Sequence, residues 1–310
     1  MALKVGLGLP TLGELGSAEN VKKIASFAES EGFDSVWVIE RQLWPINPQT
    51  PYPVTPDGSF PTIYQKILDP IETLTFVAGI TSKIKLGTGV VDMLYYNPTI
   101  LAKRLATLDN LSEGRLLAGL GVGHSKDEFQ AVGVPFEKRG ERADEFLEVL
   151  RKIWTEDIVE HKGKYFSIPK SKIGPKPFQK PFPPIYLGGF SHKTFERIIK
   201  FGARGWLGVP LPDIDTFAQS IKALKEAAKN AGRDPRTIEF PTLIAPEVSE
   251  ADKGQNRNLF NGSIDEIASD IKRLEEIGVD HVFVQFEFST HGQDIQKTMQ
   301  YGKRLLGKVR

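Results

Sequence analysis

The chain contains no cysteine among its 310 residues, which excludes disulfides, thiolate metal sites and a cysteine nucleophile. Its 40 basic and 39 acidic residues leave a net charge of +1, without the Lys/Arg tract of a nucleic-acid footprint. No apolar run reaches the length of a membrane span, and the N-terminus starts with a strand pattern rather than a signal peptide. Its five His residues show no metal-ligand spacing. We therefore expect a soluble, cytoplasmic, globular protein with no membrane, nucleic-acid or metal partner.

The clearest positive signal is a strand, a helix and a second strand, at Ile84–Val91, Asn97–Leu111 and Arg115–Gly121. Both strands are nearly apolar on both faces, and Pro98 suits the first position of the helix between them. Two buried strands joined through a helix indicate a βαβ crossover in a parallel sheet. Function in such sheets gathers at the carboxyl ends of the strands, where this stretch has its glycine clusters.

Strand and helix patterns alternate along the whole chain. An amphipathic helix repeatedly stops at a Gly and a strand begins a few residues later, as at Gly32, Gly202 and Gly278. Eight strands alternating with helices predict an α/β fold, a closed (β/α)8 TIM barrel in one domain over residues 1–310, rather than an open doubly wound sheet. The expected strands are Leu3–Leu9, Ser35–Ile39, Ile84–Val91, Arg115–Gly121, Pro184–Leu187, Gly205–Val209, Ile238–Ala245 and His281–Phe286. The expected helices are Ala18–Glu31, Asp69–Thr81, Asn97–Leu111, Gly140–Trp154, His192–Phe201, Asp213–Ala231, Ser263–Ile277 and Asp294–Leu306.

Two segments exceed what a minimal barrel needs, one after the second strand and one after the fourth. Residues 41–68 are rich in Pro and aromatic residues and too long for an ordinary loop, so they are either disordered or a functional wall. Their apolar and aromatic content favours the wall, and with it an apolar or flat substrate. Residues 158–184 contain a turn between two short strands, which predicts a hairpin. Both segments are expected to set the choice of substrate.

Polar residues follow two of the expected strands. Glu40 and Arg41 come directly after the second strand and Trp44 follows shortly after, so they form either a loop ion pair over a core Trp or part of a site. His124 follows the fourth strand, directly after the glycines that end it. It is either a structural residue or a proton-transfer group, for which an ordinary pKa near 6.5 is suited.

Glycines mark two other strand ends. Gly89 and Val90 form either a simple tight turn or a close approach of the backbone to a flat ligand. After the fifth strand, Gly188-Gly189-Phe190-Ser191 leads into a helix, whose free N–H groups and dipole suit a phosphate. The chain has no P-loop, no dinucleotide-binding glycine motif after its first strand, no His-Glu-x-x-His motif and no Ser nucleophile elbow.

These motifs together resemble the luciferase-like superfamily, and within it the oxidoreductases that use the deazaflavin coenzyme F420. The resemblance covers most of the chain, from Leu3 to about Leu306, through "GFDSVWV", "LGTGV", "LAKRLATLDNLSEGRLLAGLGVG", "HSKDEFQAVGVPFEKRGERADEFLEVLRKIW", "GKYFSIPKSKIGPKPFQKPFPPIYLGG" and "RLEEIGVDHVFVQF". It implies a homodimeric TIM-barrel enzyme that transfers a hydride between F420 and a small organic substrate at the barrel mouth. Two alternatives stay open. One is a flavin monooxygenase that uses reduced FMN from a separate reductase, and the other is a non-catalytic flavin-binding barrel.

The resemblance also implies roles for the residues at the strand ends. Gly89 and Val90 become the bulge against the cofactor ring, where relatives often have a non-prolyl cis peptide. Gly188 to Ser191 become the loop for the cofactor phosphate, and Gly121 lies beside the cofactor. Relatives commonly carry Asp-His where this chain has Glu40 and Arg41, so this chain lacks a His base there. Glu40 is then expected at the pyrimidine edge of the cofactor, Trp44 over its ring face, and His124 as the proton donor.

Overall fold

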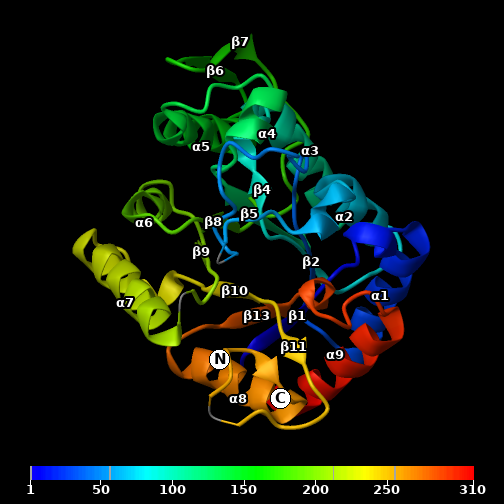
Figure 1. Ribbon diagram of the computed structural model, residues 1–310. Helices are drawn as coiled ribbons and strands as arrows, with labels where there is room; N and C mark the ends of the chain where they lie inside the picture. The colour runs from blue at the N-terminus through cyan, green and yellow to red at the C-terminus, as the bar shows by residue number, and fades with distance from the viewer. Residues whose placement is uncertain (1, 56, 212, 255) are drawn as a thin grey trace.

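The computed structural model describes residues 2–55, 57–211, 213–254 and 256–310. Within these ranges, eight parallel strands follow one another around a barrel in the order β10-β13-β1-β2-β3-β5-β8-β9 (Figure 1). Hydrogen bonds of 3.0 Å from Gly208 N to Pro241 O and from Leu243 N to Gly208 O join the two ends of this series. The fold is the predicted (β/α)8 TIM barrel. The strands are β1 Lys4–Gly8, β2 Ser35–Val38, β3 Lys85–Thr88, β5 Leu116–Gly121, β8 Ile185–Gly188, β9 Gly205–Leu207, β10 Pro241–Ile244 and β13 His281–Val284.

Helices cover the outside of the barrel, and both chain ends lie on the same side of it (Figure 1). The long helices match the predicted ones closely, because their ends carry clear signals. Helix α1 starts after Ser17, whose Oγ accepts from Asn20 N, and ends at Gly32 with a φ of +85°. The helices are α1 Ala18–Glu31, α2 Pro70–Ala78, α3 Pro98–Leu111, α5 Arg139–Thr155, α6 His192–Lys200, α7 Ile214–Asn230, α8 Ile264–Glu276 and α9 Ile295–Val309, with a short, unpredicted α4 at Lys126–Ala131.

The third predicted strand, Ile84–Val91, is interrupted rather than continuous. β3 ends at Thr88, and β4, Val91–Asp92, pairs instead with β5. The break falls at the Gly89–Val90 peptide bond, which is cis. The family resemblance implied a cis bond at this place, and the structure has it.

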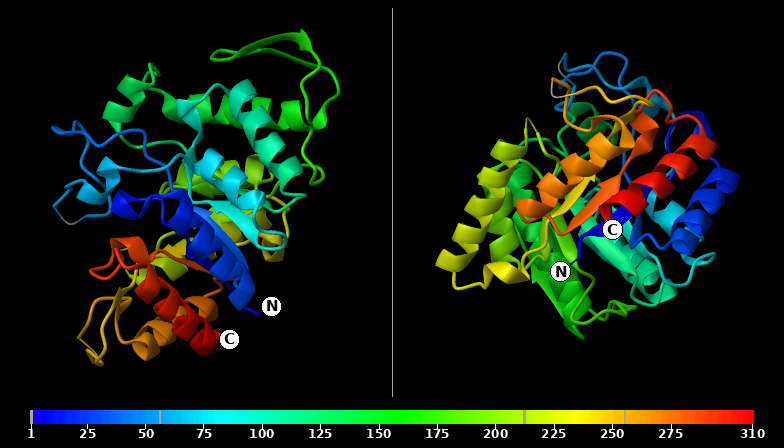
Figure 2. Two further views of the ribbon diagram at one scale, coloured as in Figure 1. Left: turned by 90° about the vertical axis from the view of Figure 1, so that its right-hand side faces the viewer. Right: turned by 90° about the horizontal axis from the view of Figure 1, so that it is seen from below.

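The two predicted insertions are both ordered in the described residues. The segment 41–68 packs on the barrel through Tyr64 and Ile39, and Leu12 pairs with Ile67 in an antiparallel bridge. The second insertion contains the predicted hairpin, an antiparallel pair of β6 Val159–Lys162 and β7 Ser167–Ser171. The hairpin extends away from the barrel beyond α5 (Figure 2). The described residues of the segment 41–68 thus pack against the barrel, as the wall alternative requires.

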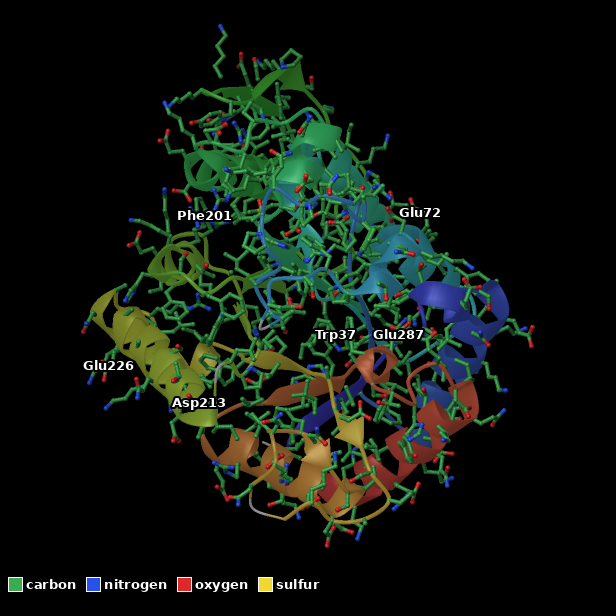
Figure 3. The ribbon with its side chains drawn as sticks, in the orientation of Figure 1. Trp37, Glu72, Phe201, Asp213, Glu226 and Glu287 are labelled. Atoms are coloured by element: carbon green, nitrogen blue, oxygen red, sulfur yellow. The ribbon has the colours of Figure 1, made fainter. Side chains whose placement is uncertain are left out.

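Aromatic side chains fill the interior of the barrel. Trp37 and Phe283 stack with ring centroids 4.2 Å apart and an interplanar angle of 11°. Trp37 lies near the centre of the ring of strands (Figure 3). Gly87 makes room for it, since a Cβ there would lie 2.3 Å from Cδ2 of Trp37. Because the interior is packed, a ligand has to bind at one end of the barrel.

Candidate active site

One cavity of about 1440 Å³ opens at the carboxyl ends of the strands. It is lined by side chains that follow β2, β3, β5, β8, β9 and β10, together with the wall segment. All the site residues named from the sequence line this cavity except Trp44. They are Glu40, Gly89, Val90, Gly121, His124, Gly188, Gly189, Phe190 and Ser191. These residues are far apart in the chain, so the barrel topology alone brings them together.

The side chain of Val90 lies in a gap left by two glycines. A Cβ at Gly121 would lie 2.6 Å from Val90 Cγ2, and a Cβ at Gly188 would lie 2.9 Å from Val90 Cγ1. Distances this short exclude larger residues without displacement of the bulge. The three residues form a fitted surface in the cavity wall, against which a flat ring can lie.

Glu40 is buried at the end of β2 and lines the cavity. Its Oε2 accepts a hydrogen bond of 2.6 Å from Asp92 N, and its Oε1 accepts from the hydroxyl of Tyr96. Burial, and then the neighbouring carboxylate of Asp92, raise the pKa of Glu40 to about 8. With this pKa, Glu40 keeps its proton at neutral pH.

Asp92 lies beside Glu40 and also lines the cavity. Its Oδ1 accepts a hydrogen bond of 2.9 Å from Gly123 N. Burial raises the pKa of Asp92 to about 6, so this carboxyl also exchanges its proton near neutrality. Of the neighbouring tyrosines, Tyr96 donates to Glu40 and Tyr95 donates to Glu128, so both act behind the cavity wall.

Arg41 does not pair with Glu40, as the loop ion pair predicted from the sequence would require. Its Nη1 lies 3.1 Å from Oε2 of Glu128, and the two side chains are 10% and 0% exposed. The guanidinium lies over the rings of Tyr52 and Tyr64, 5.3 and 5.4 Å from their centroids. The charge of Arg41 is thus balanced by Glu128 and enclosed by the aromatic wall.

His124 lines the cavity from the segment after β5. Its ring packs against Tyr52 and Phe60, with centroids 5.8 and 6.1 Å away. Its Nε2 is buried and has no hydrogen-bond partner among the described residues. Burial, and then the positive charges of Arg41 and Arg139, lower the pKa of His124 to about 4. The imidazole is therefore neutral at pH 7, not poised near 6.5 as its ordinary pKa suggested.

Trp44 is the predicted site residue that the structure places elsewhere. Its indole packs with the cluster of Leu12, Ile39 and Tyr64, and its Nε1 donates to Phe60 O at 3.3 Å. The indole packs the wall segment against the barrel. It is therefore not available to cover a ring in the cavity.

The loop Gly188–Ser191 leads from β8 into α6 and lines the cavity throughout. Gly189 has a φ of +130°, a conformation that side chains rarely adopt. Ser191 is the N-cap residue of α6, but its side chain makes no capping bond. The N-terminus of α6 therefore opens at the cavity, at the loop where a phosphate was predicted.

Glu128 is the important site residue that the sequence did not reveal. Ser125 and Glu128 have the spacing of a capping box, and Ser125 Oγ does accept from Glu128 N. That pattern was a signal for α4. The Glu128 carboxylate, however, turns to the wall segment and accepts from Gln42 N at 2.7 Å. No local sequence pattern encodes a contact across so many residues.

Within the described ranges, no three His, Asp or Glu side chains gather in a way that would hold a metal ion. None of the helices in these ranges combines the length and the apolarity that crossing a membrane requires.

Comparison with known proteins gives consistent matches over most of the chain. Residues 4–270 match the family model described as luciferase-like monooxygenase. An uncharacterized protein of Mycobacterium tuberculosis is 34% identical over 258 residues, which are 81% of this chain and 90% of that protein. An F420-dependent glucose-6-phosphate dehydrogenase of Kineococcus radiotolerans is 30% identical over 258 residues, 77% of this chain and 70% of that protein.

Two solved structures share the fold. The monooxygenase RslO1 from Streptomyces bottropensis has a TM-score of 0.80 at 22% identity, over 98% of this chain and 99% of that one. An F420-dependent secondary alcohol dehydrogenase, in complex with an F420-acetone adduct, has a TM-score of 0.79 at 19% identity over 100% of both chains.

Proposed function

The chain belongs to the luciferase-like monooxygenase family, and from that premise we propose that it is an oxidoreductase that transfers a hydride between coenzyme F420 and a small organic substrate. The choice of F420 is supported by the glucose-6-phosphate dehydrogenase relative, which is F420-dependent and 30% identical. The alcohol dehydrogenase that shares the fold is F420-dependent as well. The substrate site is the part of the cavity next to the wall segment.

One observation carries this proposal: a single cavity combines the fitted Gly121–Val90–Gly188 surface with a helix N-terminus and two proton-exchanging groups. The fitted surface suits a flat tricyclic ring, because a side chain at either glycine would displace Val90. The loop Gly188–Ser191, at the start of α6, suits the phosphate of the cofactor. The residues present therefore fit a deazaflavin.

F420 supplies or accepts a hydride at C5 when it is bound. A hydride transfer between an alcohol and a carbonyl compound also moves one proton at the substrate oxygen, and the protein must handle that proton. Glu40 and His124 have pKa values displaced in opposite directions, to about 8 and about 4. Groups displaced in this way divide the acid and base roles between them. Glu40 holds a proton that it can give, and the neutral imidazole of His124, which lines the cavity, can accept the proton of the substrate oxygen.

Titration of the purified protein with F420 and with FMN tests the proposal. We expect F420 to bind at least about tenfold more tightly than FMN, which corresponds to about 1.4 kcal/mol. Tighter binding of FMN would instead support the flavin monooxygenase alternative; the Streptomyces neighbour is named a monooxygenase. Tight F420 binding without turnover of any alcohol or carbonyl compound would support the non-catalytic barrel.

A further inference from the structure

The cavity has a cationic end, built by the starts of two helices. Lys138 and Arg139 stand at the start of α5, and Lys193 and Arg197 belong to α6, which follows the Gly188–Ser191 loop. The two helices meet here, since Arg197 Nη2 donates to Gly140 O at 2.9 Å. Four basic residues thus line the same cavity as the loop that we assign to the cofactor phosphate. Arg197 is paired with Asp144 at 2.6 Å and the exposed Lys193 with Glu196 at 2.8 Å, whereas Lys138 and Arg139 are the basic residues at the start of α5.

The other end of the cavity is apolar and aromatic. It is formed by the wall segment, β10 and the turn after β13. Tyr64 joins these elements, with its ring centroid 5.7 Å from those of Tyr52 and Phe288. Leu243 packs against the same cluster. Apart from Arg41, the lining residues that these elements and the segments 207–211 and 258–260 contribute, among the described ones, carry no charged side chain. We call this part of the cavity the aromatic end.

Arg41 is the cation that borders the aromatic end, and its charge is already paired with a carboxylate. Glu128 balances it at 3.1 Å, and Tyr52 and Tyr64 cover it. A phosphate or carboxylate bound here would lose its hydration without gaining an unpaired cation, and that is unfavourable. The nearby carboxyls of Glu40 and Asp92 would add repulsion whenever they ionise.

The aromatic end nevertheless offers one polar contact for a substrate. Nε2 of His124 is buried beside Tyr52 and Phe60 and has no hydrogen-bond partner among the described residues. Because the His124 ring itself lines the cavity, its imidazole is the group at this end that a substrate oxygen would approach.

We propose that the substrate is an uncharged, largely apolar alcohol or carbonyl compound, bound at the aromatic end with its oxygen at His124, and that sugar phosphates and carboxylates are excluded. This proposal rests on the proposed function. Oxidation of such an alcohol breaks its carbinol C–H and its O–H bonds and gives the carbonyl compound. The hydride, with both electrons, reduces F420, and the hydroxyl proton leaves through His124. Reduction of the carbonyl compound is the reverse. The substrate therefore differs in charge from the glucose 6-phosphate of the 30% identical relative.

The test uses protein loaded with F420, after binding of F420 has been measured. Cyclohexanol and 4-hydroxycyclohexanecarboxylate form a matched pair that differs in one carboxylate, and glucose 6-phosphate represents the sugar phosphates. We expect kcat/KM for cyclohexanol to exceed that for the carboxylate about 100-fold or more, and no turnover of glucose 6-phosphate. The product ketone should also raise the Tm of the loaded protein, whereas 4-oxocyclohexanecarboxylate should not.

Variants at the two ends of the cavity test which end determines the preference for an uncharged substrate. Leu243→Arg adds a cation to the aromatic end and should reduce the preference for cyclohexanol at least tenfold, with Leu243→Met as the matched control that keeps it. Lys193→Ala at the cationic end should weaken F420 binding and leave the preference unchanged. If Leu243→Arg binds F420 like the unchanged protein, it is folded and its preference can be interpreted.

The outcomes separate this inference from the function on which it rests. Failure to bind F420 removes the proposed function. Binding of F420 together with preferred turnover or stabilisation by glucose 6-phosphate or by either carboxylate overturns the inference and keeps the function. An unchanged preference in a folded Leu243→Arg variant also overturns it, because the substrate then binds elsewhere.

Discussion

The Arg41 guanidinium and the Glu128 carboxylate form a buried ion pair, with 3.1 Å between Nη1 and Oε2. Arg41 starts the wall segment after β2, and Glu128 belongs to α4, which follows β5. Glu128 also accepts hydrogen bonds from Gln42 N and from the hydroxyl of Tyr95. One carboxylate thus fixes the wall segment against the segment that carries the candidate proton-transfer residue His124.

Glu128→Ala should lower the free energy of unfolding by about 3–5 kcal/mol, because it leaves the buried charge of Arg41 without a partner. Urea denaturation measures this loss. Asp127→Ala is the matched control, since Asp127 also bonds the wall segment through Gln49 but at an exposed position. It should cost about 1 kcal/mol or less. Equal losses in the two variants would show that the buried pair does not hold the wall.

His124→Ala should lower kcat about 100-fold, the usual scale for loss of a group that transfers a proton. The Kd for F420 should change little, because the glycine surface and the phosphate loop bind the cofactor. Since burial and Arg41 lower the pKa of His124 to about 4, the unchanged protein should lose activity as this group is protonated near pH 4. His124→Ala should abolish that acidic limb. A kcat within a few-fold of the original would make His124 a wall residue.

Glu40→Gln should remove the alkaline limb of the pH profile of activity. Burial raises the pKa of Glu40 to about 8, so its proton is present at pH 7 and is lost above pH 8. In the direction of alcohol oxidation, His124 would take the substrate proton while the protonated Glu40 would offset the negative charge that the hydride brings to the cofactor, so kcat/KM should fall above about pH 8 in the unchanged protein and in His124→Ala. Glu40→Gln should be slow at every pH. An alkaline limb that persists in Glu40→Gln would assign the proton to another group, with Asp92 examined next.

Glu40 also makes stability depend on pH. Its pKa is about 8 in the folded protein and near the ordinary 4.5 when unfolded, so between these values the folded state binds more protons. Its contribution to stability is complete below pH 4.5 and is lost as the pH rises to about 8, by at most about 1.4 kcal/mol per pH unit. Glu40→Gln should flatten this part of the stability curve, measured by denaturation at several pH values.

Gly188→Val should weaken F420 binding tenfold or more, about 1.4 kcal/mol. The Cβ would lie 2.9 Å from Val90 Cγ1, so the variant displaces the bulge on which the ring is proposed to lie. Gly307→Val is the control, because no atom lies within 4 Å of a Cβ at that exposed helical position. Fluorescence titration gives both affinities. A folded Gly188→Val protein with unchanged affinity would remove this surface from the cofactor site.

The order of strands and helices could be predicted from the sequence, because it depends on local signals. Apolar periodicity, caps such as Ser17 and stops such as Gly32 act within a few residues, and they suffice to predict a barrel. The barrel in turn predicts that Glu40, Gly89, His124 and Gly188 meet, since the carboxyl ends of parallel strands share one edge.

The partners and protonation of these residues were decided by the tertiary structure alone. Arg41 pairs with Glu128 rather than with the adjacent Glu40, and Trp44 holds the wall rather than covering the cavity. The pKa values of Glu40 and His124 move apart because burial removes water and because charges from distant segments lie beside them. Contacts between segments so far apart in the chain follow from packing in three dimensions, which no local pattern encodes.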